Sequence, residues 1–343
     1  MLNFELQDAA DKLVNKMLQL KPGESFIITA DTSSNMKVVE AIASSAVAAG
    51  ALPMVVVTKT PDGVGKAVDP AIPVDVMTAA LCECDAWVEV NRGWLLYSTP
   101  YEIAEKKNKK MRYINMCDFD EETLVRIIGK VDYDSIKKFM QATHELHVGA
   151  KKMRATTPAG TDVSFECDDR HLITCDYGDA STPGIWMCPG QLNIVPKFGT
   201  VNGTIVFDGS ITPPFKSVLS SPVKLTVENS NIVNVEGGSE AAQFYNWLKS
   251  WNDEGMLKMA HMAYGFNPGA TLTGNVVEDE RIWGAVEWGI GYVSSMDAPE
   301  GGQDAASHTD GICLNASVWI DDEQLLDNGK IVHPAVKDLS PVK

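Results

Sequence analysis

A histidine and an aspartate stand two residues apart in the segment Ser307-His308-Thr309-Asp310-Gly311. In a β-strand, residues i and i+2 extend from the same face, so this imidazole and this carboxylate can reach one ion. Together with a second imidazole they would form the two-histidine-one-carboxylate set that binds non-haem iron(II) and leaves coordination positions open. The same pair also occurs in surface turns, and the spacing alone does not decide between a metal site and a turn.

The third ligand must come from another segment, and His261 is the candidate. It lies in the apolar run Leu257-Lys-Met-Ala-His261-Met-Ala-Tyr264-Gly265. A histidine that is buried among methionine and alanine must form a hydrogen bond or coordinate a metal. A core histidine with a hydrogen-bond partner is the alternative interpretation, because sequence spacing gives no distance between residues 261 and 308.

Carboxylates and further histidines complete the set of reactive side chains. Glu287 lies in the apolar segment Gly284-Ala-Val-Glu-Trp-Gly289, where an unpaired charge is costly, so we predict a role as ligand or general base, with a buried ion pair as the alternative. The run Glu278–Glu280 predicts a solvated turn. His144 and His147 are three residues apart in a charged helical pattern and predict a solvated helix face.

Strands and helices alternate over the first 150 residues. Short apolar runs predict buried strands at 25–30, 52–58, 86–90 and 111–116. Helical patterns separate them at 6–20, 36–49, 74–81, 101–108 and 120–128. This alternation predicts right-handed βαβ crossovers and a parallel, Rossmann-like sheet. The strand-to-helix turns carry no glycine-rich dinucleotide or phosphate-loop motif, so we expect the sheet to bind no such cofactor.

The composition changes after a helical connector at 134–154 and becomes rich in Thr, Val, Gly and Pro. Strand patterns follow at 162–167, 194–196, 204–207, 223–227, 256–264, 283–291 and 311–320, with one helix at 240–251. We therefore predict an α/β protein with two domains. Residues 1–150 form the Rossmann-like domain, and residues 151–343 form an α+β domain that carries the metal site.

Charge and cysteine content exclude several classes of protein. The 343 residues include 46 acidic and 29 basic side chains, a net charge of −17, which argues against a nucleic-acid partner. The seven cysteines form no CxxC pair, so neither a disulfide framework nor a zinc ribbon is expected. No leader pattern opens the chain, and the longest apolar stretch, 41–57, is interrupted by Ser, Gly and Pro. We expect a cytoplasmic protein without a membrane span.

Four segments, in this order, resemble 2,5-dihydroxypyridine 5,6-dioxygenase, which belongs to the wider superfamily of thermophilic, M29-type metallo-aminopeptidases. They are Gly203–Lys216 (GTIVFDGSITPPFK), Ala260–Ala270 (AHMAYGFNPGA), Ser307–Asp310 (SHTD) and Val318–Asp322 (VWIDD). The resemblance implies one Fe(II) per chain on His261, His308 and Asp310. It also implies a dihydroxylated pyridine as small-molecule substrate, O2 as co-substrate, and a homo-oligomer.

The aminopeptidases of this superfamily hold two metals, and the chain departs from their pattern. His261 and Gln191 stand where glutamates are expected, and Glu287 stands where a histidine is expected. A glutamine cannot supply the negative charge that two adjacent dications need, so we expect a mononuclear site. The histidine that the dioxygenase uses as a base falls in the segment Trp186-Met-Cys-Pro, which holds no imidazole. Glu287 is therefore our candidate for the catalytic base.

Three residues are predicted to contact the substrate: Trp186, Gln191 and Tyr264. Aromatic rings at the first and last of these positions would stack on an aromatic ligand, and packing in the core is the alternative. Two other functions stay open. One is a hydrolase of amide or cyclic amide bonds that uses zinc or manganese, with Glu287 as the base for a metal-bound water. The other is a binding protein without catalytic activity.

Overall fold

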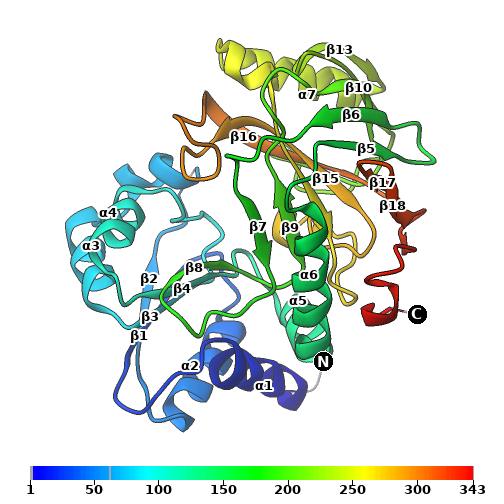
Figure 1. The fold of residues 1–343 in the computed structure, drawn as a ribbon. Helices are drawn as coiled ribbons and strands as arrows, with labels where there is room; N and C mark the ends of the chain where they lie inside the picture. The colour runs from blue at the N-terminus through cyan, green and yellow to red at the C-terminus, as the bar shows by residue number, and fades with distance from the viewer. Residues whose placement is uncertain (1–2, 62, 343) are drawn as a thin grey trace. The chain divides into compact units, whose positions relative to one another are not determined.

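The computed structural model describes residues 3–61 and 63–342, which divide into two compact units (Figure 1). The first unit contains the chain up to Val131 and again Asp176–Pro189. The second contains Asp132–Cys175 and the chain from Gly190 onward. This division differs from the predicted boundary at residue 150, because the connector helix belongs to the second unit and a later segment returns to the first.

A five-stranded parallel sheet forms the centre of the first unit, as the alternating pattern predicted. Its order is β2-β1-β3-β4-β8. The strands are β1 (Ser25–Asp31), β2 (Leu52–Thr58), β3 (Ala86–Glu89), β4 (Arg112–Asn115) and β8 (Gly184–Met187). The sequence did not indicate β8, and the prediction that 52–58 is a buried strand is wrong. Because β2 is an edge strand, most of its side chains are half-buried or exposed.

Helices cover both faces of this sheet (Figure 1). They are α1 (Asn3–Lys12), α2 (Met36–Ala48), α3 (Val74–Glu83), α4 (Thr99–Lys107) and α5 (Glu121–Leu124), with π-helical turns at Leu13–Met17 and Val125–Gly129 and a 3-10 helix at Gly65–Ala71. Side-chain caps begin two of these helices: Asn35 accepts hydrogen bonds from the first turn of α2, and Ser98 does so for α4. Alternate strand residues, among them Ile27 and Trp87, pack against α3 and α4.

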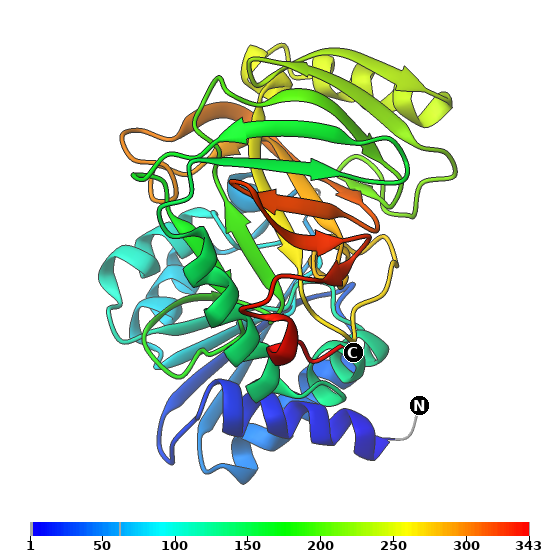
Figure 2. The ribbon, with the colours of Figure 1, turned by 45° about the vertical axis from the view of Figure 1, so that its right-hand side comes forward.

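The second unit contains two antiparallel sheets. The larger has the order β13-β12-β10-β6-β5-β17-β18-β19. Its strands are β5 (Lys152–Thr156), β6 (Asp162–Glu166), β10 (Asn202–Phe207), β12 (Val223–Glu228), β13 (Asn231–Gly237), β17 (Ser317–Ile320), β18 (Glu323–Asp327) and β19 (Lys330–Ile331). Figure 2 shows β5 and β6 in green beside β17 and β18 in red, so this sheet joins segments that are far apart in the sequence.

The smaller sheet has the order β11-β16-β15-β14-β9-β7. Its strands are β7 (Ile173–Asp176), β9 (Gln191–Ile194), β11 (Ile211–Thr212), β14 (Met259–Gly265), β15 (Val286–Val293) and β16 (Gln303–Cys313). The helices of this unit are α6 (Tyr133–His147), α7 (Ser239–Ser250) and α8 (Val276–Asp279), with 3-10 turns at Glu254–Leu257 and Lys337–Leu339. The predicted α/β fold class, with a parallel-sheet domain followed by an α+β domain, is confirmed.

One face of the smaller sheet is apolar and packs against the larger sheet. Trp288 of β15 meets Phe165 of β6 edge-on, with ring centroids 5.9 Å apart. Gly311 of β16 lies against the ring of Phe207 on β10. Because side chains alternate along each strand, the residues between these positions extend from the opposite face. That opposite face carries most of the sheet's polar side chains.

The connector helix α6 is shorter and more buried than the sequence predicted. It ends at His147 instead of continuing to 154, and Gly149 then adopts a φ of +81°, which a helix cannot contain. The predicted solvated face is wrong for His147, which is 3% exposed. Its Nδ1 lies 2.8 Å from the Thr143 carbonyl oxygen and its Nε2 lies 3.0 Å from the Tyr264 hydroxyl. None of the described helices has the length and apolarity to cross a membrane.

Candidate metal centre

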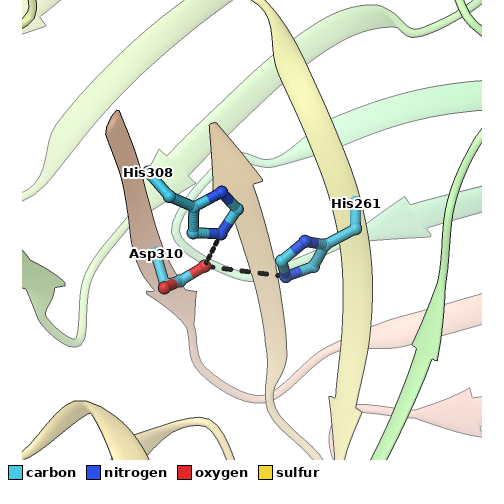
Figure 3. Close-up of side chains that lie close together, drawn as sticks. All are labelled: His261, His308 and Asp310. Carbon is cyan, nitrogen blue, oxygen red and sulfur yellow. Dashed lines mark hydrogen bonds and ion pairs between the residues drawn. The ribbon is translucent and has the colours of Figure 1, made fainter. Parts of the chain in front are cut away.

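His261, His308 and Asp310 lie together on the polar face of the smaller sheet. His261 extends from β14 and the other two from β16, with β15 between them (Figure 3). One ligand atom from each residue lies within 4.8 Å of the other two. Asp310 Oδ1 is 2.9 Å from His308 Nε2 and 3.6 Å from His261 Nε2. The structure therefore brings together the three side chains that the sequence suggested.

Strand register and one glycine produce this convergence. His308 and Asp310 are two residues apart on β16 and share a face, as predicted, and Asp310 pairs with Gly289 of β15. The His261 ring lies across Gly289: a Cβ at that position would be 2.4 Å from His261 Cε1 and 2.8 Å from Nε2. Only a residue without a side chain leaves β15 open for this imidazole to reach toward β16.

A hydrogen bond fixes which nitrogen of His308 can bind a metal. Its Nδ1 is 2.8 Å from the carbonyl oxygen of Tyr292, which can only accept. Nδ1 must therefore carry the proton in the neutral ring, and Nε2 presents a lone pair toward Asp310 and His261. Metal-binding histidines are commonly oriented in this way by a carbonyl or carboxylate behind the ring.

Two of the three separations between the donor atoms are compatible with ligands of one metal ion. Two ligands at right angles, each about 2.1 Å from an ion, are about 3.0 Å apart. The separations of 2.9 and 3.6 Å are close to that value. Two imidazoles and one carboxylate on one side of an ion leave the remaining coordination positions for other ligands.

Glu287 borders the three ligands. It extends from β15, is 1% exposed, and its Oε1 lies 2.6 Å from His261 Nε2. Its Oε2 accepts a hydrogen bond of 3.0 Å from the amide nitrogen of Gln191. Burial raises the pKa of Glu287 well above its usual value, and the neighbouring charge of Asp310 raises it further. This carboxyl group is thus able to hold a proton beside the candidate metal centre.

The charges of Asp310 and His308 support one another. Burial alone would raise the pKa of Asp310, but the charge of His308 and the hydrogen bond from its ring lower it to about 2. Burial alone would lower the pKa of His308, but the charge of Asp310 raises it. The carboxylate of Asp310 therefore keeps its negative charge next to the ring of His308.

A second group of carboxylates adjoins the first. Oxygen atoms of Glu280, Glu287 and Asp310 lie within 4.8 Å of one another. Burial raises the pKa of Glu280 to about 8, and the charges of Glu287 and Asp310 contribute. Arg281, which is 0% exposed, donates from Nη1 to Glu280 Oε2 at 3.1 Å. Sequence reasoning missed both Glu280 and Arg281.

The prediction of a solvated turn at Glu278–Glu280 is wrong, because Glu278 and Asp279 are fully buried. Their carboxylates accept hydrogen bonds from the preceding loop, where the backbone nitrogens of Thr271 and Thr273 donate to Glu278 and Asp279 respectively. A run of acidic residues normally indicates a solvated segment. Its interior position here depends on partners that no local pattern indicates.

The other predicted site residues have different locations. Gln191, on β9, contacts Glu287 as described. Tyr264 is 0% exposed, extends from the apolar face of the sheet and forms a hydrogen bond with His147, so it does not line the metal centre. Trp186 lies on β8 in the first unit, where its indole nitrogen donates to the Thr182 carbonyl oxygen at 3.0 Å.

Gly289 is a further functional residue that the sequence analysis did not identify. An isolated glycine within a strand pattern indicates a close approach by another group. The segment Glu287-Trp288-Gly289-Ile290-Gly291 contains two such glycines, and this was the available signal.

Comparisons with known proteins show which proteins this chain is similar to. A 2,5-dihydroxypyridine 5,6-dioxygenase of Pseudomonas putida KT2440 is 25% identical over 225 residues, which is 62% of this chain and 62% of that protein. The solved structure of 2,5-dihydroxypyridine dioxygenase from the same organism has a TM-score of 0.81, with 20% identity over 98% of this chain and 99% of that one. Wild-type AmpT from Thermus thermophilus has a TM-score of 0.68, with 15% identity over 96% and 99%. The two structures show that the fold is shared.

The family described as NicX, 2,5-dihydroxypyridine 5,6-dioxygenase, matches residues 9–333, which include most of both units and every residue of the centre described above. The resemblance that the four sequence segments indicated is thereby confirmed, and the chain belongs to the 2,5-dihydroxypyridine 5,6-dioxygenase family.

Proposed function

We propose that the protein is a mononuclear non-haem iron(II) dioxygenase that opens the ring of a dihydroxylated N-heteroaromatic compound such as 2,5-dihydroxypyridine. The observation that carries this proposal is the convergence of two imidazoles and one carboxylate on one face of a sheet, within 4.8 Å of one another. Family membership supports the reaction and the substrate class. Two histidines and one carboxylate are the ligand set of iron(II) oxygenases.

His261, His308 and Asp310 would hold the ion. When bound, Fe(II) supplies open coordination positions for an oxygen-bearing substrate and O2, and it polarises the substrate hydroxyl groups. The protein contributes ligand orientation: the carbonyl oxygen of Tyr292 fixes the tautomer of His308, and Gly289 leaves room for the ring of His261. Both contacts place the Nε2 atoms before any ion arrives, which reduces the cost of binding.

Glu287 is the proposed proton acceptor for a substrate hydroxyl group. Gln191 holds its Oε2, so Oε1 is the atom that remains directed at the centre. A bound dication would lower the pKa of this carboxyl group by its charge and return it to the ionised form that a base requires. This assignment agrees with the absence of an imidazole in the segment Trp186-Met-Cys-Pro.

The remaining expectations accompany this function as proposals. Trp186 and Gln191 are proposed to contact the substrate, and the protein is proposed to be a cytoplasmic homo-oligomer. Tyr264 is not retained as a substrate contact, because its hydroxyl group is used by His147 inside the unit.

Oxygen consumption tests the proposal. The protein is purified without a histidine tag, loaded with Fe(II) and mixed with 2,5-dihydroxypyridine or catechol in an oxygen-electrode cell. We expect substrate-dependent O2 uptake with the pyridine and no turnover of the pyridine under argon. His308→Ala should fold but lose its iron, and it should show no O2 uptake. Turnover under argon, or turnover of amide substrates that depends on zinc or manganese, would instead establish a metal-dependent hydrolase.

A further inference from the structure

Two side-chain amides extend from the same face of β9, and they differ in the partners of their oxygen atoms. Gln191 and Asn193 are two residues apart, so both lie on the face that carries the candidate metal centre. The Gln191 amide donates to Glu287 Oε2 at 3.0 Å and accepts from Arg281 Nη2 at 3.1 Å. Asn193 Oδ1, in contrast, is buried and has no hydrogen-bond partner in the described part of the chain.

A buried amide oxygen without a partner is unfavourable for the folded protein. Such an atom has lost its hydrogen bonds to water and has gained none in exchange. In folded proteins most buried polar atoms have a partner, so an exception calls for a reason. Trp288 Nε1, on the apolar face of the sheet, is another unpaired atom, so the position of Asn193 decides whether a ligand can reach it.

Strand register places Asn193 at a distance from the centre that a small ring can span. Asn193 pairs with Ala263 of β14, and Ala263 pairs with Glu287 of β15. In this row across the sheet, only a methyl group stands between the amide and the carboxyl group. Gly289, over which the His261 ring lies, is two residues further along β15, so its α-carbon is about 12 Å from that of Asn193. The amide side chain and a six-membered ring with oxygens on opposite sides can bridge this separation.

The proposed substrate carries groups that are complementary to a carboxamide. A pyridine with a hydroxyl group at position 2 exists in water mainly as the pyridone, in which a ring N–H donor stands beside a carbonyl acceptor. A carboxamide presents the matching pair, an oxygen that accepts and an NH2 group that donates. Two parallel hydrogen bonds can join such groups, as when asparagine binds the edge of adenine. Hydroquinone has the same shape and both oxygens but lacks the ring N–H.

We propose that Asn193 binds the lactam edge of the substrate and thereby selects an N-heteroaromatic ring over a carbocyclic one. Its Oδ1 accepts from the ring N–H, and its Nδ2 donates to the carbonyl oxygen at position 2. The hydroxyl group at position 5 then faces the metal ligands and Glu287, the proposed proton acceptor. This inference rests on the proposed function and assigns a specificity-determining role to a residue that no sequence pattern indicated.

Equilibrium binding tests the inference without turnover. Protein loaded with Mn(II) is titrated by calorimetry under argon with 2,5-dihydroxypyridine and with hydroquinone. We expect the wild type to bind the pyridine about 10-fold to 100-fold more tightly, because the ring without an N–H leaves the buried amide oxygen unpaired. Asn193→Leu is similar in size and has no polar group. It should bind the pyridine about 10-fold to 100-fold more weakly than the wild type does, with little change for hydroquinone.

A reversed preference separates ligand contact from a structural role. The protonated form of 2-amino-5-hydroxypyridine presents two donors on one edge, and a carboxylate accepts both. Asn193→Asp should therefore bind this compound more tightly than the wild type does, and bind 2,5-dihydroxypyridine more weakly. A residue that only supports the fold would not exchange one ligand for the other.

A control variant and a stability measurement complete the test. Asn234→Leu makes the same chemical change at an exposed position of β13 in the larger sheet and should leave the binding of both rings unchanged. Asn193→Leu removes an unpaired buried oxygen, so its thermal midpoint should be at or above that of the wild type.

The inference is overturned if the wild type binds both rings equally, a result that does not depend on any variant folding. It is also overturned if Asn193→Leu keeps the preference for the pyridine or loses affinity for both rings alike. Pyridine-selective binding that depends on Asn193, together with no O2 uptake, would leave the inference standing and refute the dioxygenase reaction. O2 uptake on the pyridine with unchanged binding in Asn193→Leu would do the reverse, and a wild type that does not bind the pyridine would refute both.

Discussion

Replacing Gly289 with alanine should displace the imidazole of His261, which is a proposed metal ligand. The new Cβ would lie 2.4 Å from His261 Cε1, 2.5 Å from its Nδ1 and 2.8 Å from its Nε2. To restore an ordinary contact of 3.4 Å, the ring must move by about 1 Å. The backbone itself accepts alanine, because Gly289 is not among the described residues with positive φ.

The displacement is large on the scale of metal coordination. Productive metal–ligand distances vary by about 0.2 Å, so a shift of about 1 Å removes His261 Nε2 from bonding range. We expect metal affinity to fall by at least about 10-fold to 100-fold, the loss typical of disturbing a residue that orients a ligand. Crowding in a packed sheet should cost about 1–3 kcal/mol of stability.

Gly311→Ala is the matched control. Its Cβ would meet Phe207 at 2.4 Å on the apolar face of the same sheet, and this glycine also lacks a positive φ. It should lower the thermal midpoint at least as much as Gly289→Ala but retain Mn(II) affinity in calorimetric titration. Equal affinities for Gly289→Ala and wild type would refute the reasoning, as would equal losses of affinity in both glycine variants.

Two other variants test different parts of the molecule. Glu287→Gln should lower kcat by about 10²-fold to 10⁴-fold, the usual contribution of a general base, while bound iron measured by mass spectrometry stays at the wild-type level; unchanged kcat would remove Glu287 from the mechanism. In the first unit, burial raises the pKa of Glu89 to about 7, despite a hydrogen bond of 2.6 Å from the Tyr113 hydroxyl. The folded state therefore holds this proton more tightly than the unfolded state. The stability that this group contributes is present in full below its unfolded pKa near 4.5 and is lost as the pH rises through 7. Between about pH 5.5 and pH 8 the loss should be roughly 2 kcal/mol. Urea unfolding of Glu89→Gln should lack this component, and an identical pH dependence in both proteins would contradict the placement of that proton.

Local sequence patterns predicted which segments form strands and helices better than they predicted which segments pair with one another. The i, i+2 spacing placed His308 and Asp310 on one face, since alternation is a property of any strand. The position of His261 depends on the register of three strands and on Gly289, and pairing between distant segments sets that register. The resemblance to a known family supplied this ligand, and no pattern in the residues did.

The errors have a common physical origin in tertiary partners. An acidic run is normally solvated, but Glu278 and Asp279 are buried because a loop provides their hydrogen bonds. His147 is buried because Tyr264 provides a hydroxyl group from another strand. The run at 52–58 was predicted to be buried because it is apolar. It is an edge strand, and nothing in its own sequence indicates whether a further strand pairs with it.

The fifth strand of the parallel sheet, β8, affects how the protein is made. It pairs with β4, yet the ribosome synthesises α6, β5, β6 and β7 between the two. During translation, one edge of β4 therefore stays unpaired while segments of the other unit are synthesised. Exposed strand edges favour association between chains. A nascent chain that stalls in this interval therefore exposes an unpaired strand edge, and fragments that end before residue 184 would carry the same open edge permanently.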